Sequence, residues 1–127
     1  LLEGIILKPN MIVPGLSCPK QESIEEVADA TVDCLLRCVP AAVPGIAFLS
    51  GGQSPELASA RLNAMNLRFK GKLPWELSFS FGRAIQQPAL EIWHGKEANT
   101  AAAQKELHLR AKCNFAARRG EYQLEKE

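Results

Sequence analysis

The sequence contains no apolar run near the roughly 20 residues that a membrane-spanning helix needs. Its formal net charge is only +1, too small for the strong field by which proteins attract nucleic acids or acidic membranes. The first eleven residues carry an early acid, Glu3, and lack the basic segment and small-residue cleavage site of a secretory signal peptide. We therefore expect a cytoplasmic protein with no nucleic-acid and no membrane partner.

Residues that bind metals are also scarce. The chain has two histidines, His94 and His108, and neither stands at ligand spacing from a cysteine pair. No CxxC occurs among the four cysteines, which are Cys18, Cys34, Cys38 and Cys113. This composition favours free thiols over a zinc site, so we expect no metal and no other cofactor.

What is present is an ordinary globular composition, with 46% apolar and 23% charged residues in a 127-residue chain. That length is typical of one domain. The sequence begins without methionine, inside an apolar segment, and for that reason we expect a fragment of a longer protein.

Three short apolar runs predict buried strands at residues 4–8, 45–50 and 77–83. The first two do not alternate cleanly, which is typical of strands buried on both faces of a parallel sheet. Helical patterns lie between and after them, over residues 23–39, 55–66 and 99–119, and residues 89–95 predict a short helix or a turn. This alternation predicts an α/β fold with parallel strands.

Local signals mark the helix ends. Ser23 and Glu26 form a capping-box pattern, and Ser54 followed by Pro55 is typical of a helix start. Gly120 is placed to end the last helix, and we expect the charged tail at 121–127 to fray.

Each predicted strand ends in a polar signal. Lys8 ends the first strand, Ser50, Gly51 and Gly52 follow the second, and Gly82 and Arg83 end the third. Ligands of α/β proteins gather at the carboxyl ends of the strands, so these groups should meet at one edge of the sheet.

Lys8 allows two interpretations. Burial at the mouth of an apolar barrel disfavours a charged ammonium, and the resulting amine can attack a carbonyl to form a Schiff base. Alternatively, Lys8 is a strand-end lysine that extends to water, which is the simpler interpretation of this stretch taken alone.

The glycine motifs also allow two interpretations. A serine hydroxyl with glycine amides suits a phosphate oxygen, and an arginine offers a fork of donors that fits the same group. Taken singly, Ser50-Gly51-Gly52 can be a simple turn and Arg83 a surface ion-pairing residue. Taken together at neighbouring strand ends, they predict one phosphate pocket.

The residues around these motifs resemble the class I fructose-1,6-bisphosphate aldolases. The matching stretches are "LEGIILKPNMIVPG", "FLSGGQSPELASARLNAMN" and "PWELSFSFGRAIQ". The resemblance covers nearly all of the chain and about the last third of the family's length. It implies that residues 1–127 are the C-terminal part of a single (β/α)8 domain, namely the last three βα units of a TIM barrel.

The resemblance also implies a reaction and a set of site residues. The reaction is reversible cleavage of fructose 1,6-bisphosphate, a step of glycolysis and gluconeogenesis, by a homotetramer that needs no metal. Lys8 corresponds to the Schiff-base lysine. The implied phosphate-binding residues are Ser50, Gly51, Gly82 and Arg83, with Gly52, Leu49 and Gln86 at neighbouring positions.

The family's proton-transfer acids lie on earlier strands and are absent from this sequence. Two other functions therefore stay open: an inactive fragment that serves as a structural or binding piece, and another Schiff-base aldolase on the same fold, such as a transaldolase.

Overall fold

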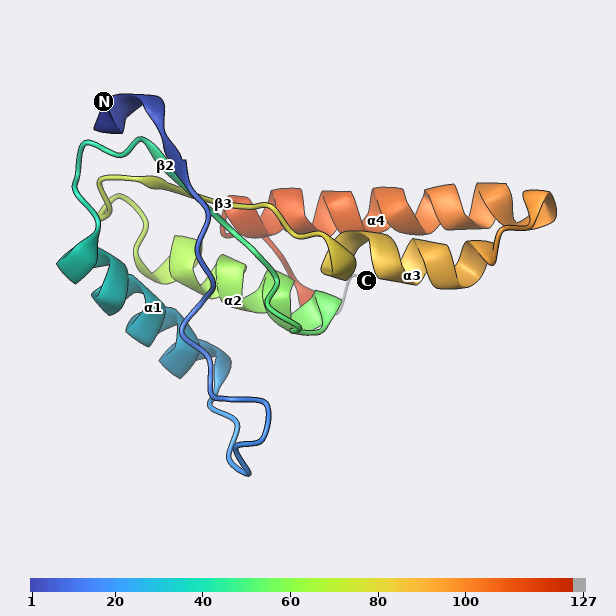
Figure 1. The fold of residues 1–127 in the computed structure, drawn as a ribbon, viewed down its shortest axis with the longest axis horizontal. Coiled ribbons are helices and arrows are strands. Elements are labelled where there is room, and N and C mark those ends of the chain that lie inside the picture. Colours follow the sequence, from blue (N-terminus) through green and yellow to red (C-terminus); the bar gives the residue numbers. More distant parts are fainter. Residues whose placement is uncertain (125–127) are drawn as a thin grey trace.

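The computed structural model describes residues 1–124 (Figure 1). In chain order, its elements are η1 (Leu2–Gly4), β1 (Ile6–Leu7), α1 (Ile24–Cys38), β2 (Gly45–Phe48), α2 (Pro55–Arg68), β3 (Glu76–Phe79), α3 (Arg83–Trp93), η2 (Glu97–Asn99) and α4 (Thr100–Arg118). Within this range, no helix combines the length and apolar character needed to cross a membrane.

The strands form a parallel sheet in the order β1-β2-β3, which confirms the predicted α/β class. Figure 1 shows α1 and α2 side by side along the sheet, while α3 and α4 form a hairpin that extends away from it. The core lies between the sheet and these helices. Its most deeply buried side chains come from α1, β2, α2 and β3 and include Val32, Phe48, Leu62, Met65 and Leu77.

All three predicted strands are shorter than expected, and the second, expected over 45–50, is Gly45–Phe48. The first, expected over 4–8, is reduced to Ile6–Leu7, and Ile6 is 64% exposed, not buried on both faces. Within the described residues β1 pairs only with β2, so its other edge has no partner to extend or cover it. The third, expected over 77–83, is Glu76–Phe79.

The predicted third strand ends early because residues 80–82 form a short connection and a helix begins at Arg83. The Gly82 carbonyl accepts hydrogen bonds from the backbone N–H groups of Ile85 and Gln86, which begins α3 at Arg83. The short helix or turn expected at 89–95 is therefore the second half of an 11-residue helix with Pro88 inside it. Strand-like alternation before Gly82 masked this boundary in the sequence.

The predicted helix caps are confirmed. The Ser23 hydroxyl accepts from the Glu26 N–H at 3.2 Å, and the Glu26 carboxylate accepts from the Ser23 N–H at 3.0 Å. The latter bond favours the charged carboxylate and lowers the pKa of Glu26. Ser54 caps α2 with Pro55 at its first position, and Gly120, at φ +72°, follows the end of α4.

The chain after α4 is anchored at Tyr122. Tyr122 is 8% exposed, and its backbone N–H donates to the Asn63 side-chain oxygen at 2.9 Å. The expectation of a frayed tail is therefore wrong at Tyr122, and residues 125–127 lie outside the described part.

Asn66 joins three elements. Its side-chain amide donates to the carbonyl oxygens of Leu62 in α2 at 3.1 Å, Leu77 in β3 at 3.4 Å and Ala117 in α4 at 3.2 Å. The helix continues past it to Arg68, so Asn66 fixes tertiary packing and does not close the helix end.

We predict that Asn66→Ala lowers the free energy of unfolding by about 1–3 kcal/mol, because it leaves carbonyl acceptors without this donor. Asn66→Asp should cost more at neutral pH, since it places a carboxylate against those oxygens. Its deficit should shrink in acid, where a protonated carboxyl can donate once. Denaturant unfolding of the complete gene product at two pH values measures both variants, and equal pH dependence in both would contradict this assignment.

Candidate functional site

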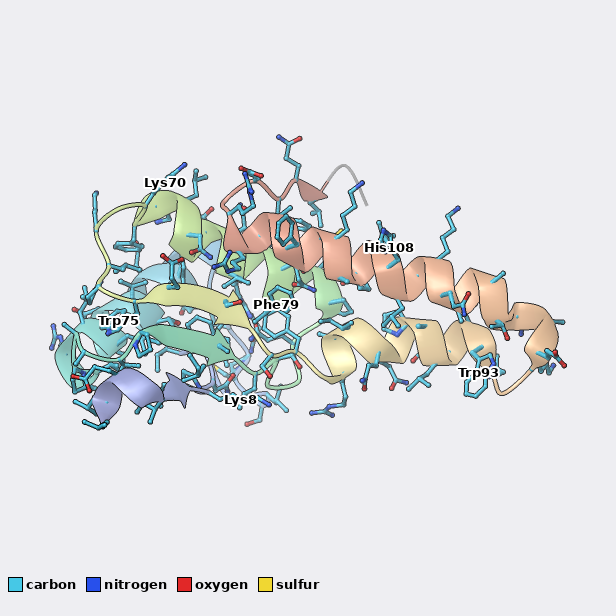
Figure 2. The ribbon with its side chains drawn as sticks, turned by 90° about the horizontal axis from the view of Figure 1, so that it is seen from above. Lys8, Lys70, Trp75, Phe79, Trp93 and His108 are labelled. Carbon is cyan, nitrogen blue, oxygen red and sulfur yellow. The ribbon has the colours of Figure 1, made fainter. Side chains whose placement is uncertain are left out.

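The predicted site groups lie at one edge of the sheet. Figure 2 shows Lys8 and Phe79 at the end toward which the strands run, and Lys70 and Trp75 at the opposite end. Lys8 directly follows β1, and its side chain is exposed in this part of the chain. The topology therefore brings the lysine to the same edge as the loops after β2 and β3.

Backbone hydrogen bonds align these loops beyond the strands themselves. The Leu49 N–H donates to the Pro9 carbonyl at 3.0 Å, and the Ser80 N–H donates to the Phe48 carbonyl at 2.8 Å. Pairing thus continues one or two residues past each strand, so the segments that carry the site residues lie side by side.

The loop after β2 requires glycine for its own shape. Gly51 and Gly52 have φ values of +58° and +83°, a region that favours glycine. The Gln53 N–H donates to the Ser50 carbonyl at 3.0 Å and closes the turn, and Ser50 is only 6% exposed. The motif is therefore a glycine turn, and this finding leaves open whether the turn also binds a ligand.

Asn10 is a contact residue of this loop that sequence reasoning missed. A side chain added at Gly51 would collide with the Asn10 carboxamide, so the first and second strand ends pack tightly together there. The Asn10 side-chain oxygen also accepts from the Met11 N–H at 2.9 Å. The sequence sign of this contact is that Asn10 follows Lys8 and Pro9 directly, at the end of the first strand.

Gly82 and Arg83 occupy the start of α3. The first N–H groups of a helix have no intrahelical acceptor, and this end carries the positive pole of the helix dipole. Gly82 has φ −87°, and a side chain added there would meet no atom within 4 Å. The described residues therefore give no steric reason for glycine at this position.

One cavity contains much of the predicted phosphate site. It has a volume of about 370 Å³, and its lining includes Ser50, Gly52, Gln53 and Arg83. Gln86 lines a different cavity, of about 450 Å³, between α3 and α4. The first cavity thus joins Ser50 and Gly52 to Arg83. Its lining does not include the other predicted site residues, which are Lys8, Leu49, Gly51, Gly82 and Gln86.

The same cavity contains two carboxylates, and each has a partner. Glu56 lies 3.8 Å from the Arg110 guanidinium, and Glu91 accepts from the Gln87 amide at 2.8 Å. Arg83, Gly52 and the start of α2 at Pro55 line the same cavity. Across residues 1–124, no group of three or more His, Cys, Asp or Glu could hold a metal ion. The donors present suit an anion.

Comparison with known proteins places this chain in a family. The model of class-I fructose-bisphosphate aldolase matches residues 1–127. The chain is 58% identical over 121 residues to aldolase B of Sparus aurata, covering 95% of this chain and 33% of that protein. It is 57% identical over 122 residues to a cytoplasmic aldolase isozyme of Pisum sativum, covering 96% of this chain and 33% of that protein.

A solved structure agrees with the sequence relatives. Plasmodium falciparum fructose-bisphosphate aldolase, crystallised with TRAP and a small-molecule inhibitor, superposes with a TM-score of 0.91 at 47% identity. The match covers 97% of this chain and 35% of that one. The chain belongs to the class I fructose-bisphosphate aldolase family, which confirms the resemblance. It spans about a third of the length of the curated relatives it matches.

We predict that Gly51→Ala lowers the free energy of unfolding by about 1–3 kcal/mol, because alanine is strained at positive φ and collides with Asn10. Gly52→Ala is the matched control, since it has positive φ but open space around it. Adding Asn10→Ala should recover part of the Gly51→Ala loss and none of the Gly52→Ala loss. Thermal unfolding measures this double-mutant cycle, and strictly additive effects would refute the contact.

Proposed function

We propose that this chain is the C-terminal part of a Schiff-base fructose-bisphosphate aldolase. Residues 1–127 would supply the last three βα units of a single (β/α)8 barrel. The complete protein would cleave fructose 1,6-bisphosphate reversibly to dihydroxyacetone phosphate and glyceraldehyde 3-phosphate, in glycolysis and gluconeogenesis. The observation that carries the proposal is that Lys8, the Ser50–Gly52 loop and Arg83 share one edge of a parallel sheet in a chain of this family.

Lys8 is the proposed catalytic residue. Its amine attacks the ketose carbonyl of the substrate, water leaves, and a protonated imine forms. That imine accepts the electron pair released when the carbon–carbon bond breaks, so the lysine replaces a metal ion as the electron sink. Pro9, which follows Lys8, cannot donate to a ladder, and the chain leaves the strand directly after the lysine.

The proposed phosphate site consists of the Ser50 hydroxyl, the backbone amides of Gly51, Gly52 and Gly82, and the Arg83 guanidinium. The shared cavity of Ser50, Gly52 and Arg83 supports it, as does the start of α3 beside them. Gly82 has open space in place of a side chain, which leaves room for a ligand to approach its amide. Leu49 and Gln86 are retained as neighbouring positions of the pocket, Gln86 with less support because it lines another cavity.

The remaining properties of the proposal concern the complete protein. We infer a phosphorylated sugar as substrate, a homotetrameric assembly and a cytoplasmic location, the last supported by relatives named as cytoplasmic isozymes. Acids that transfer protons in the family lie on strands outside this sequence, so the 127 residues alone would be inactive.

A second candidate is a free-standing fragment that acts only as a binding or structural piece. The exposed Ile6 and the unpaired outer edge of β1 argue against its stability, because such edges promote aggregation. Intact-mass measurement of the protein from its source separates the candidates. A mass of 13.9 kDa supports the fragment, and a mass about three times larger supports the complete enzyme.

We predict that dihydroxyacetone phosphate and sodium borohydride label Lys8 in the complete gene product, because borohydride reduces an imine to a stable amine. Peptide mapping by mass spectrometry locates the adduct. Lys8→Arg should abolish the label and lower kcat at least about 100-fold, since the covalent intermediate is lost.

Lys20→Arg is the matched control, because Lys20 is an exposed lysine that pairs with Glu22 at 3.1 Å. It should keep both the label and the activity. A reduced adduct on any lysine other than Lys8 would disprove the assigned mechanism.

A further inference from the structure

Two arginines are buried along α2 and α4, and they differ in whether a carboxylate lies near the guanidinium group. Arg110 is 2% exposed, and its guanidinium donates to the Ser59 hydroxyl at 3.0 Å and lies 3.8 Å from the Glu56 carboxylate. Arg61 is 5% exposed and has no carboxylate within ion-pair distance among residues 1–124. Burial alone lowers the pKa of Arg61, although arginine stays charged in proteins.

The single side-chain partner of Arg61 in the described residues is Gln53. The Arg61 Nη1 donates to the Gln53 Oε1 at 2.9 Å, which commits the acceptor of that carboxamide. The Arg61 Nε and the Gln53 Nε2 are both buried and have no acceptor in this part of the protein. Among residues 1–124, this region is therefore rich in donors, and no carboxylate lies within ion-pair distance of its positive charge.

Gln53 connects this charge to the candidate phosphate cavity. Its backbone N–H closes the Ser50 turn at 3.0 Å, and its side chain lines the cavity together with Ser50, Gly52 and Arg83. Arg61 does not itself line the cavity, and its side chain is linked to the loop through Gln53. Buried charge interacts more strongly than exposed charge, because little water screens it.

We propose that Arg61 is a positioning residue for a phosphate group bound at this loop. The bound phosphoryl group balances the charge of Arg61, and Gln53 transmits the geometry of α2 to the turn. The inference rests on the proposed function and adds two residues, Gln53 and Arg61, to its phosphate site.

This role predicts an unusual pair of effects. Replacing Arg61 by an apolar side chain of similar length removes the cost of burying a charge, and it also leaves the Gln53 Oε1 without its donor. The same change removes the charge that favours the ligand. Because these two contributions oppose each other, Arg61→Met should change the melting temperature without ligand only slightly. It should weaken phosphate binding at least about fivefold, the lower end of typical coupling effects.

Inorganic phosphate is the probe, applied to the complete gene product. Calorimetric titration gives its Kd, and thermal unfolding gives the rise in Tm that saturating phosphate produces. In Arg61→Met both the affinity and this rise should fall, and KM for fructose 1,6-bisphosphate should increase more than kcat changes. Arg61→Lys, which keeps the charge, should restore most of the affinity.

Arg37→Met is the matched control, because Arg37 is an exposed helix arginine paired with Asp33 at 3.0 Å. It removes one positive charge without touching the loop, so its phosphate affinity should equal that of the wild type. Arg61→Gln is a second neutral variant for use if Arg61→Met does not fold, and the same loss is expected of it.

Each outcome bears on a separate claim. If the wild type binds no phosphate and Lys8 carries no borohydride adduct, the proposed function fails. If the wild type binds phosphate and the folded neutral Arg61 variant binds it equally well, only the role of Arg61 is overturned. A neutral variant that lowers Tm without ligand but retains the full phosphate-induced rise would likewise reduce Arg61 to a structural residue.

Discussion

The continuation of the parallel ladder past its strands is the constraint on which this site depends. Two backbone hydrogen bonds, from Leu49 to Pro9 and from Ser80 to Phe48, extend pairing beyond β1 and β2. Because parallel strands end at the same edge, these backbone bonds bring the lysine, the glycine loop and the arginine to one edge of the sheet. The chemistry of the edge therefore comes from topology first, and side chains such as Asn10 refine it by fixing how closely two loops pack.

Features coded by a few adjacent residues could be predicted from the sequence. The capping box at Ser23, the start of α2 at Ser54 and the glycine after α4 each depend on local backbone geometry, and the structure has them where the sequence indicates. The polar signals at the strand ends could be predicted for the same reason. The alternation before Gly82, in contrast, predicted a strand that continues to residue 83. The observed strand ends at Phe79, where its pairing with β2 ends, and no local sequence signal marks that point.

What the sequence could not show depends on contacts between distant residues. Asparagine is common at helix ends, yet the Asn66 amide joins β3 and α4. The residues it bonds there are 11 and 51 positions away in the sequence. An arginine within a helix is usually exposed to solvent, and only the packing of α2 shows that Arg61 is buried. Exposure and partner choice are tertiary properties, so a side chain of strong polarity gives no local sign of either.

The glycine loop shows why structural and functional explanations of one motif are compatible. Positive φ at Gly51 and Gly52 is required by the turn itself, and Gln53, which closes the turn, accepts a hydrogen bond from Arg61. A loop that must be glycine for its shape has no side chains to screen a ligand from a nearby charge. In the proposed arrangement the glycine turn and Arg61 act together, and the helix that covers the sheet contributes to the electrostatic potential at its carboxyl edge.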